Sequence, residues 1–263
     1  MIALVFTVYT LKWSEEVRGL ELKFDHIIHY VHQLNEADIN FMKVINGGKH
    51  ETLGTYNKLS YTDLSYIEFI DAFDRELVYS AVNSESERLS FAATLERTGY
   101  KEGFKRLCFR TDNIVQLKEH LNNLGVSTIG PTKMKRVTPE GKCIEWQLLY
   151  IDETKRFELP FFIQWQEEDD FRERNLSQYF QGNLSMEAIE IETTDFDEIA
   201  EVFVNWIGYE VIGGVINSYF KLVKEGSLDI YLIPGNQDSI KSLIIKSDTP
   251  EEHHFRNAIY KFI

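Results

Sequence analysis

A single acidic side chain interrupts an otherwise apolar stretch of this chain. Glu68 lies between Ile67 and Phe69 in the run SYIEFID, where a buried strand would normally carry another aliphatic residue. Burial of a carboxylate is strongly unfavourable unless the group is paired or protonated. Two explanations remain open from the sequence: Glu68 belongs to a functional site, or it lies on an edge strand that faces water.

A histidine lies in a second apolar run, FDHIIHYVHQL. Side chains of a strand alternate between two faces, so His26 and Ile28 share one face while Asp25 and His29 share the other. Imidazole and carboxylate groups bind divalent metals and transfer protons. A lone histidine in an apolar strand is more often a core residue than a ligand, so His26 by itself does not define a site.

The composition excludes several classes of partner. The chain has 263 residues, enough for one large domain or two ordinary ones. Its 42 acidic and 28 basic residues give a formal net charge of −14. This balance argues against nucleic acid and anionic membranes as main partners, because both would repel the protein.

Cysteine use and the first residues indicate a cytoplasmic protein. Cys108 and Cys143 are far apart and form no C-x-x-C pattern, so we expect reduced thiols in a reducing compartment. The start, MIALVFTVYTLKW, is too short to span a bilayer and lacks the basic region and cleavage site of a secretory signal. We therefore interpret residues 1–21 as an N-terminal extension.

Four stretches of the chain share one rhythm of strand, helix and further strands. The first has a strand within 22–34, a helix over 35–45 that ends at Gly47-Gly48, and two more strands. The second begins at 104–114, and its helix ends at Gly125. The third begins at 184–196 and continues through a helix over 197–208, whereas the fourth, 241–263, has room for only one strand, one helix and a last short strand.

This rhythm predicts an α+β fold built from repeated βαβββ modules. One module leaves a sheet face exposed, and pairing two modules covers that face and creates a cleft between them. We place the first pair at residues 22–166 and a second, degenerate pair at 184–263. The intervening residues 167–183 are strongly charged and predict a solvated connector.

Five runs carry a family resemblance. Together they resemble a glyoxalase-like domain of the vicinal-oxygen-chelate superfamily. In chain order, the runs are FDHIIHYVHQL, GGKHETLGTYNKL, YIEFI, LCFRTDNI and LPFFIQW. The resemblance covers 22–166 well, and 184–263 shares only the βαβ rhythm. It implies sheets that curl around a shared cleft. In metal-dependent members, the first and last strands of each module hold a divalent ion that polarises neighbouring substrate oxygens, and other members bind a compound without metal.

The resemblance assigns roles residue by residue. His26 and Glu68 match the ligand positions of module one, and such a pair suits zinc, manganese, iron or nickel. In module two, Arg106 and Gln164 stand at the ligand positions. A guanidinium cannot coordinate a cation, and Gln164 offers only a neutral oxygen. Arg106 would instead pair with Glu68 or hold the carboxylate of an anionic ligand.

Three hypotheses for the function follow. In the first, the cleft binds a small, oxyanion-bearing organic molecule. His26 and Glu68 act as metal ligands or acid–base groups, His50, Asn57, Arg106 and Gln164 make polar contacts, and Trp146 forms a pocket wall. The enzyme classes that the resemblance implies are lyase, isomerase and dioxygenase.

In the second hypothesis, a metal-free protein traps a compound without turnover, and Arg106 pairs with Glu68. In the third, the second half forms a homodimer and the cleft has no chemistry.

Overall fold

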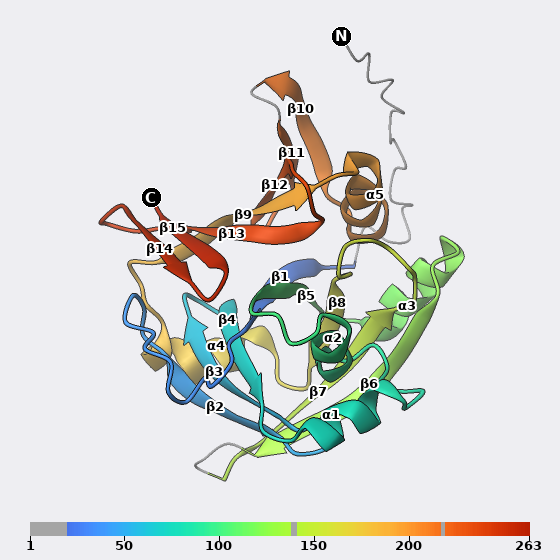
Figure 1. Ribbon diagram of the computed structural model, residues 1–263. Helices are drawn as coiled ribbons and strands as arrows, with labels where there is room; N and C mark the ends of the chain where they lie inside the picture. Colours follow the sequence, from blue (N-terminus) through green and yellow to red (C-terminus); the bar gives the residue numbers. More distant parts are fainter. Residues whose placement is uncertain (1–19, 138–140, 217–218) are drawn as a thin grey trace.

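The computed structural model describes residues 20–137, 141–216 and 219–263 and arranges their strands in two curled, mixed sheets (Figure 1). The predicted α+β class with repeated modules is confirmed. The first sheet has eight strands in the order β2-β3-β4-β1-β5-β8-β7-β6. They are β1 (Leu22–Tyr30), β2 (Ile45–His50), β3 (Thr55–Tyr61), β4 (Tyr66–Ala72), β5 (Gly103–Thr111), β6 (Thr128–Val137), β7 (Cys143–Ile151) and β8 (Phe161–Trp165). The predicted extension, residues 1–21, lies outside the described residues apart from Leu20 and Glu21.

Module two follows the predicted order of strand, helix and three strands. Its helix α3 (Ile114–Asn123) begins after Asn113, whose side chain accepts a hydrogen bond from the backbone N–H of Gln116. This contact satisfies one of the free N–H groups at a helix start. The helix ends before Gly125, which adopts a left-handed φ of 80° that glycine tolerates. The sequence prediction for this module is confirmed.

Module one differs from the prediction. The expected helix over 35–45 is wrong, because residues 31–44 form turns and an extended loop. The apolar residues that suggested helical spacing, Leu34, Ile39 and Met42, are buried against the core from this irregular loop. The helices of this half follow β4 instead, as α1 (Arg75–Val82) and α2 (Phe91–Arg97). Gly47 and Gly48 are therefore strand residues of β2 and do not end a helix.

The second sheet has seven strands in the order β10-β11-β12-β9-β13-β15-β14. Its first part repeats the module: β9 (Ser185–Thr193), α5 (Phe196–Ala200) with the π-helical turn η3 (Glu201–Ile207), β10 (Glu210–Ile216), β11 (Tyr219–Val223) and β12 (Asp229–Pro234). The helix expected within 241–263 is wrong. That stretch contains most of β13 (Ser239–Lys246) and a hairpin of β14 (Glu251–Phe255) and β15 (Ala258–Phe262). Arg256 and Asn257 both have positive φ at the turn, as a two-residue hairpin requires.

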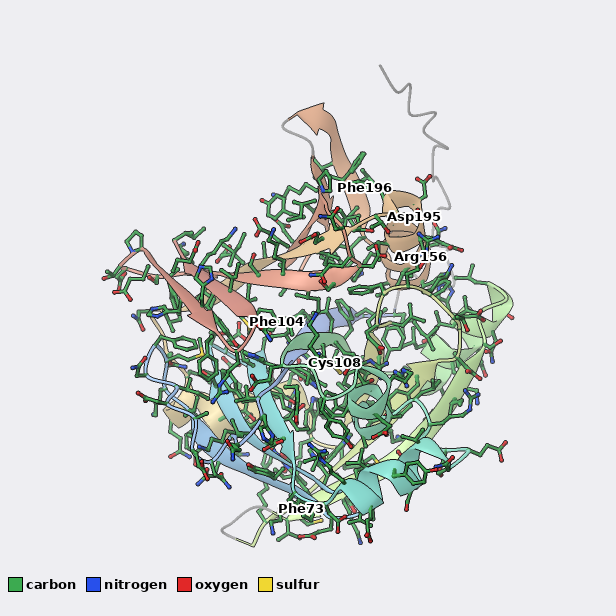
Figure 2. All side chains as sticks on the ribbon, viewed as in Figure 1. Phe73, Phe104, Cys108, Arg156, Asp195 and Phe196 are labelled. Atoms are coloured by element: carbon green, nitrogen blue, oxygen red, sulfur yellow. The ribbon has the colours of Figure 1, made fainter. Side chains whose placement is uncertain are left out.

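The two sheets pack against each other through one face of each. Side chains of β1 and β5 meet those of β9 and β13 in a shared hydrophobic core, which contains Ile27, Leu107, Ile189 and Leu243. Figure 2 shows this layer between the sheets, with Phe104 at its border and Cys108 on the side of the first sheet. The second sheet therefore covers the outer face of β1 and β5.

The first sheet curls until its two edge strands, β2 and β6, contact each other. The backbone approaches closely at Gly48, where a Cβ atom would lie 3.6 Å from the carbonyl oxygen of Val137. The inner face of the sheet thereby encloses a space. The connector contains α4 (Asp169–Leu176) and the short turn η2 (Ser177–Tyr179), which lie beside this sheet (Figure 1). Among the described residues, no helix is both long and apolar enough to cross a membrane.

Candidate functional site

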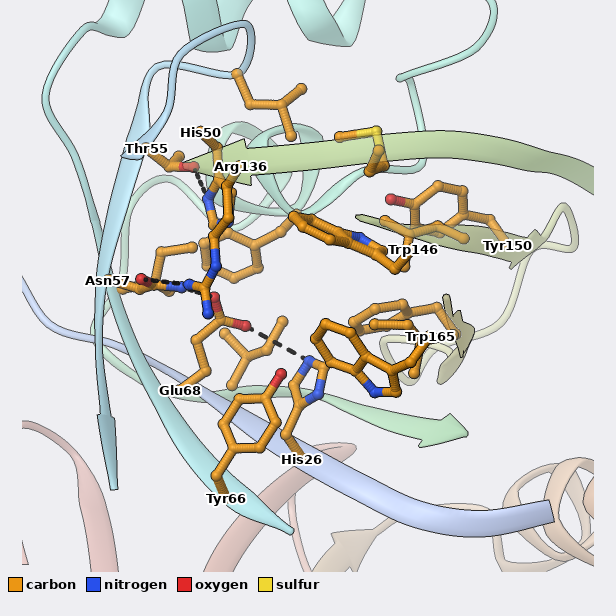
Figure 3. A pocket seen from close by; sticks show the side chains of 18 residues that line it. His26, His50, Thr55, Asn57, Tyr66, Glu68, Arg136, Trp146, Tyr150 and Trp165 are labelled. Atoms are coloured by element: carbon orange, nitrogen blue, oxygen red, sulfur yellow. Dashed lines mark hydrogen bonds and ion pairs between the residues drawn. The ribbon is translucent and has the colours of Figure 1, made fainter. Parts of the chain in front are cut away.

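A cavity of about 70 Å³ lies inside the curled sheet, and we call it the inner cavity (Figure 3). Five of the residues predicted to form a site line it: His26, His50, Asn57, Glu68 and Trp146. The polar ones come from β1, β2, β3 and β4, and therefore from module one. The wall provided by β7 and β8 is mostly apolar, and its lining residues are Trp146, Leu148, Tyr150, Phe161, Ile163 and Trp165.

His26 is oriented by a buried aspartate. Its Nδ1 lies 2.7 Å from Oδ1 of Asp25, whose Oδ2 accepts a hydrogen bond from Trp165 Nε1 at 2.9 Å. Burial by itself would raise the pKa of Asp25, but the hydrogen bond with His26 and the charges of Arg172 and Arg110 hold it below the usual range. Asp25 is therefore ionised. It accepts the Nδ1 proton of His26 and leaves Nε2 directed toward the cavity.

The contact between Asp25 and His26 depends on an irregularity in β1. The pairing of β1 with β5 shifts in register between Phe24 and His26. Regular alternation would place Asp25 and His26 on opposite faces, and the shift allows their side chains to meet. Strand alternation in the sequence therefore predicted Asp25 on the face opposite His26.

Glu68 is buried and paired. Its Oε2 lies 3.5 Å from His26 Nε2, and its Oε1 accepts a hydrogen bond from Asn57 Nδ2 at 2.5 Å. The strand β4 lies between β3 and β1, so the alternative of an exposed edge strand is wrong. Asp25, His26 and Glu68 thus form a connected array, which we call the acid–base array. Its open end lies at the inner cavity, where Figure 3 shows His26 and Glu68 facing each other.

Arg136, on β6, is a cation that the sequence analysis did not single out. One of its terminal nitrogens donates to Asn57 Oδ1 at 3.3 Å, and its Nε is buried without a hydrogen-bond partner. In the described part of the chain, no carboxylate lies within ion-pairing distance of it. Alternation would have identified it, since Arg136 and the cavity-lining Met134 share one face of β6 while Lys133 and Lys135 are exposed on the other.

His50 adds a neutral polar group to the same wall. Its Nδ1 lies 3.0 Å from the hydroxyl of Thr55, which anchors the ring. Burial lowers the pKa of His50, despite the opposing charge of Glu68, so the imidazole stays uncharged near neutral pH.

The remaining two predicted residues lie outside the inner cavity. Arg106 is buried behind the aromatic wall, where its Nε donates to the carbonyl of Leu159 and a terminal nitrogen donates to that of Leu89, both at 2.7 Å. The expected Arg106–Glu68 pair is wrong, because this guanidinium is committed to two carbonyls. Gln164 faces the other side of β8, where its amide bonds the backbone of Ile114 and Asp112 at the start of α3.

The sequence matches the glyoxalase-like domain family over residues 24–207. The chain belongs to this family. A crystal structure of a hypothetical protein from Staphylococcus aureus is 31% identical, with a TM-score of 0.88, over 92% of this chain and 99% of that one. The resemblance to the vicinal-oxygen-chelate superfamily is confirmed.

Two solved structures share the fold with this glyoxalase-like protein at low identity. The Mn(II)-bound glyoxalase from Novosphingobium aromaticivorans is 8% identical with a TM-score of 0.50, over 91% of this chain and 81% of that one. The 2,3-dioxygenase LapB from Pseudomonas sp. KL28 is 9% identical with a TM-score of 0.50, over 91% of each chain. No curated protein matches the sequence.

The donors that line the inner cavity do not complete a metal site of the kind that the resemblance implied. His26 Nε2 and Glu68 Oε2 are 3.5 Å apart, a separation that two ligands of one ion would have. On the wall opposite, however, β8 presents Phe161, Ile163 and Trp165, which offer no metal-binding oxygen, sulfur or imidazole. The guanidinium of Arg136 also borders this space and would repel a cation.

A second group of metal-binding types, Asp25, His26 and Cys108, has ligand atoms within 4.8 Å of one another. It fits a metal no better. Asp25 is already bound by Trp165 and lies within 4.0 Å of Arg110. Burial raises the pKa of the Cys108 thiol well above its usual value, so the thiolate form that binds metals is disfavoured.

Proposed function

We propose that this glyoxalase-like protein binds a small, oxyanion-bearing organic molecule in the inner cavity and transfers a proton to or from it. The observation that carries this proposal is the acid–base array, whose His26 and Glu68 meet at a mostly apolar cavity. A pocket with few polar groups on an apolar wall suits a small organic ligand. We assign this role to the first module pair, residues 22–166.

The acid–base array supplies a base and an acid at one point. Asp25 holds the proton on His26 Nδ1, so that Nε2 accepts a proton from a carbon next to a carbonyl group. The electron pair of the broken C–H bond forms a carbon–carbon double bond, and the π pair of the carbonyl group moves to its oxygen. Return of a proton to the same carbon from the other face restores the carbonyl group and completes an epimerisation, which is an isomerase reaction. Where the next carbon carries a leaving group, its departure with the bonding electron pair restores the carbonyl group and completes a lyase reaction. Glu68, held by Asn57 and 3.5 Å from Nε2, is the second group able to return the proton to the substrate.

Of the three enzyme classes that the resemblance implies, isomerase and lyase chemistry requires only these groups. Ring-cleaving dioxygenase chemistry requires a redox-active metal, for which the donor set of the inner cavity is incomplete. The metal-free binding protein remains the second candidate. The feature that favours it is the apolar wall of β7 and β8, which holds a ligand without contributing to a reaction.

Deuterium exchange separates these two candidates. Small 2-oxo acids such as pyruvate and 2-oxobutyrate are incubated with the protein in D₂O, and exchange at the carbon next to the carbonyl is followed by proton NMR. We expect the wild-type protein to accelerate the exchange. His26→Gln and Glu68→Gln should each lower this rate by about 10²- to 10⁴-fold, the usual contribution of a general acid or base.

The control is His32→Gln, which changes an exposed histidine just beyond β1 and should leave the exchange rate unchanged. Binding of these acids to the wild-type protein without any exchange would contradict the catalytic proposal and support the binding protein.

A further inference from the structure

A second, larger cavity adjoins the inner cavity. It measures about 590 Å³, against about 70 Å³ for the inner one. Arg136 and Trp165 line both spaces, and we call the place where the two cavities adjoin at these side chains the neck. We call this space the outer cavity, and its other walls come from β2, β3, β7, α4 and η2. A ligand too large for the inner cavity would extend past these two side chains into the outer cavity.

The outer cavity is rich in cations, although the chain carries a net charge of −14. The charged residues that line it are Lys58, Arg136, Lys142, Arg172 and Glu167. Lys142 is paired with Glu167 at 2.9 Å, and Arg172 with Asp169 at 3.0 Å. Arg136 has no such pair among the described carboxylates. A cavity of this charge on an acidic protein attracts anions.

Arg136 has free capacity to bind an oxyanion at the neck. A guanidinium carries five N–H donors, and the only partner that the structure shows for this one is Asn57 Oδ1, at 3.3 Å. Its buried Nε has no partner in the part of the chain described. A buried donor without a partner is unfavourable, and a ligand carboxylate would satisfy it with a bidentate, charge-assisted contact.

The walls beyond the neck suit an apolar, ring-bearing group. Tyr61, Trp165 and Tyr179 line the outer cavity together with Leu59 and Ile45. The ring of Trp165 is held in place, because its Nε1 donates to Asp25 and the guanidinium of Arg172 stacks 4.4 Å from its centre. A fixed aromatic surface stacks on a flat group at little entropic cost.

We infer that the ligand is a carboxylate with a ring-bearing apolar body, which spans both cavities. Its carboxylate binds Arg136 at the neck, the ring lies in the outer cavity against Trp165 and Tyr179, and a short reactive end enters the inner cavity. This inference rests on the proposed function for the reactive end. The binding of the carboxylate and the ring does not depend on catalysis.

Isothermal titration calorimetry with three probes tests the inference on the wild-type protein. The probes are 4-phenylbutyrate, which has both parts, 4-phenyl-1-butanol, which lacks the charge, and acetate, which lacks the ring. We expect saturable binding of 4-phenylbutyrate and at least about tenfold weaker binding of the other two. Equal affinity for the alcohol and the acid would overturn the role of the carboxylate.

Variants locate the binding. Arg136→Gln should weaken 4-phenylbutyrate binding about 10- to 100-fold, and Arg136→Lys should restore part of the loss. Arg174→Gln is the matched control, because Arg174 is exposed on α4 and does not line the outer cavity. Tyr179→Ala should weaken 4-phenylbutyrate binding and leave acetate binding unchanged. Unaltered affinity in Arg136→Gln would overturn the inference.

The two proposals fail in different ways. His26→Gln should abolish deuterium exchange and change the affinity for 4-phenylbutyrate by less than about threefold, since the two sites act independently. Binding that depends on Arg136 in a protein without exchange activity would contradict only the catalytic proposal. Exchange activity in a protein whose Arg136→Gln variant binds 4-phenylbutyrate normally would contradict only the two-cavity ligand.

Discussion

Single residues decide what the inner cavity is able to bind. The sequence indicated that an arginine close to Glu68 would disfavour a divalent cation, and it pointed to Arg106. Arg106 is occupied by two backbone carbonyls, and Arg136 is the cation at the cavity. A guanidinium on either strand repels a metal ion, so the expected effect on a divalent cation is the same.

Metal content is the corresponding prediction. Protein incubated with Mn²⁺ or Zn²⁺ and then passed through gel filtration should retain far less than one ion per chain by elemental analysis. The reason is that no third histidine, cysteine or carboxylate in the described lining of the inner cavity has a ligand atom within 4.8 Å of those of both His26 and Glu68. If the wild-type protein retained one ion per chain and Glu68→Gln did not, the prediction that the inner cavity binds no metal would be contradicted.

At the scale of elements, the contact between β2 and β6 shapes the neck. These are the two edges of the first sheet, and Arg136 of β6 reaches Asn57 of β3 across β2. Gly47 makes this passage possible. A Cβ atom at Gly47 would lie 2.1 Å from Asn57 Oδ1 and 3.0 Å from a terminal nitrogen of Arg136. The glycine pair that resembled a helix end is therefore a packing requirement at a strand edge.

Gly47→Ala should disturb the neck. The added methyl group must displace Asn57, which breaks its contacts with Glu68 and Arg136, so we expect a loss of about 1–3 kcal/mol in the free energy of unfolding. Urea denaturation followed by circular dichroism measures this loss.

Gly182→Ala is the matched control for this substitution, because nothing lies within 4 Å of its added Cβ and its change should stay within about 0.5 kcal/mol. Equal effects of the two substitutions would show that the close approach at Gly47 does not matter.

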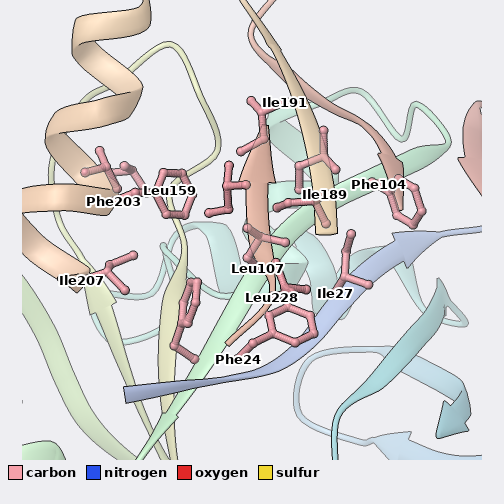
Figure 4. Packing of buried hydrophobic residues seen from close by; sticks show 14 of the residues in the cluster. Phe24, Ile27, Phe104, Leu107, Leu159, Ile189, Ile191, Phe203, Ile207 and Leu228 are labelled. Carbon is pink, nitrogen blue, oxygen red and sulfur yellow. The ribbon is translucent and has the colours of Figure 1, made fainter. Parts of the chain in front are cut away.

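At the scale of the whole molecule, the second sheet covers the outer face of the first, as the interleaved side chains of Phe24, Ile27 and Ile189 show (Figure 4). His29 lies in this interface, fully buried. Its Nδ1 is 2.6 Å from the hydroxyl of Tyr260, and its Nε2 is 3.2 Å from the carbonyl of Arg256. The interface therefore contains a titratable group whose partners both come from the second sheet.

Acid should weaken this interface. Burial, together with the charges of Lys105 and Arg256, lowers the pKa of His29 from 6.5 to about 3, although the bond to the carbonyl of Arg256 opposes the shift. Between these two values the unfolded chain binds a proton that the folded protein excludes, so the contribution of His29 to stability falls as the pH drops below 6.5. From pH 7 to pH 5 we expect a loss of about 2 kcal/mol from this residue.

Urea denaturation at the two pH values measures this loss. His29→Gln does not titrate and should show a correspondingly smaller dependence on pH, whatever its absolute stability. His32→Gln, which removes an exposed histidine, should follow the wild type. The same pH dependence in wild type and His29→Gln would rule out His29 as the titrating group.

Local features of the sequence were sufficient to predict the elements of module two and some of the residues that line the inner cavity. The cap at Asn113, the end of α3 before Gly125 and the apolar alternation around His26 and Glu68 involve residues close in the chain. Such interactions bias the backbone before any tertiary contact forms. The family resemblance follows from the same runs, so the fold class was accessible without the structure.

Only the tertiary structure decided the rest, because distant strand pairing overrides local signals. Residues 35–45 and part of 241–263 carry helix-like patterns, yet contacts with the core and the pairing of β14 with β15 hold them in other conformations. A register shift brings Asp25 to His26. Gln164 was expected in the cavity, but its neighbour Ile163 lines the cavity instead. Neighbouring positions of a strand face opposite sides, so the side chain of Gln164 points away from the cavity. Arg136 entered the site because curling of the sheet brought its two edges together.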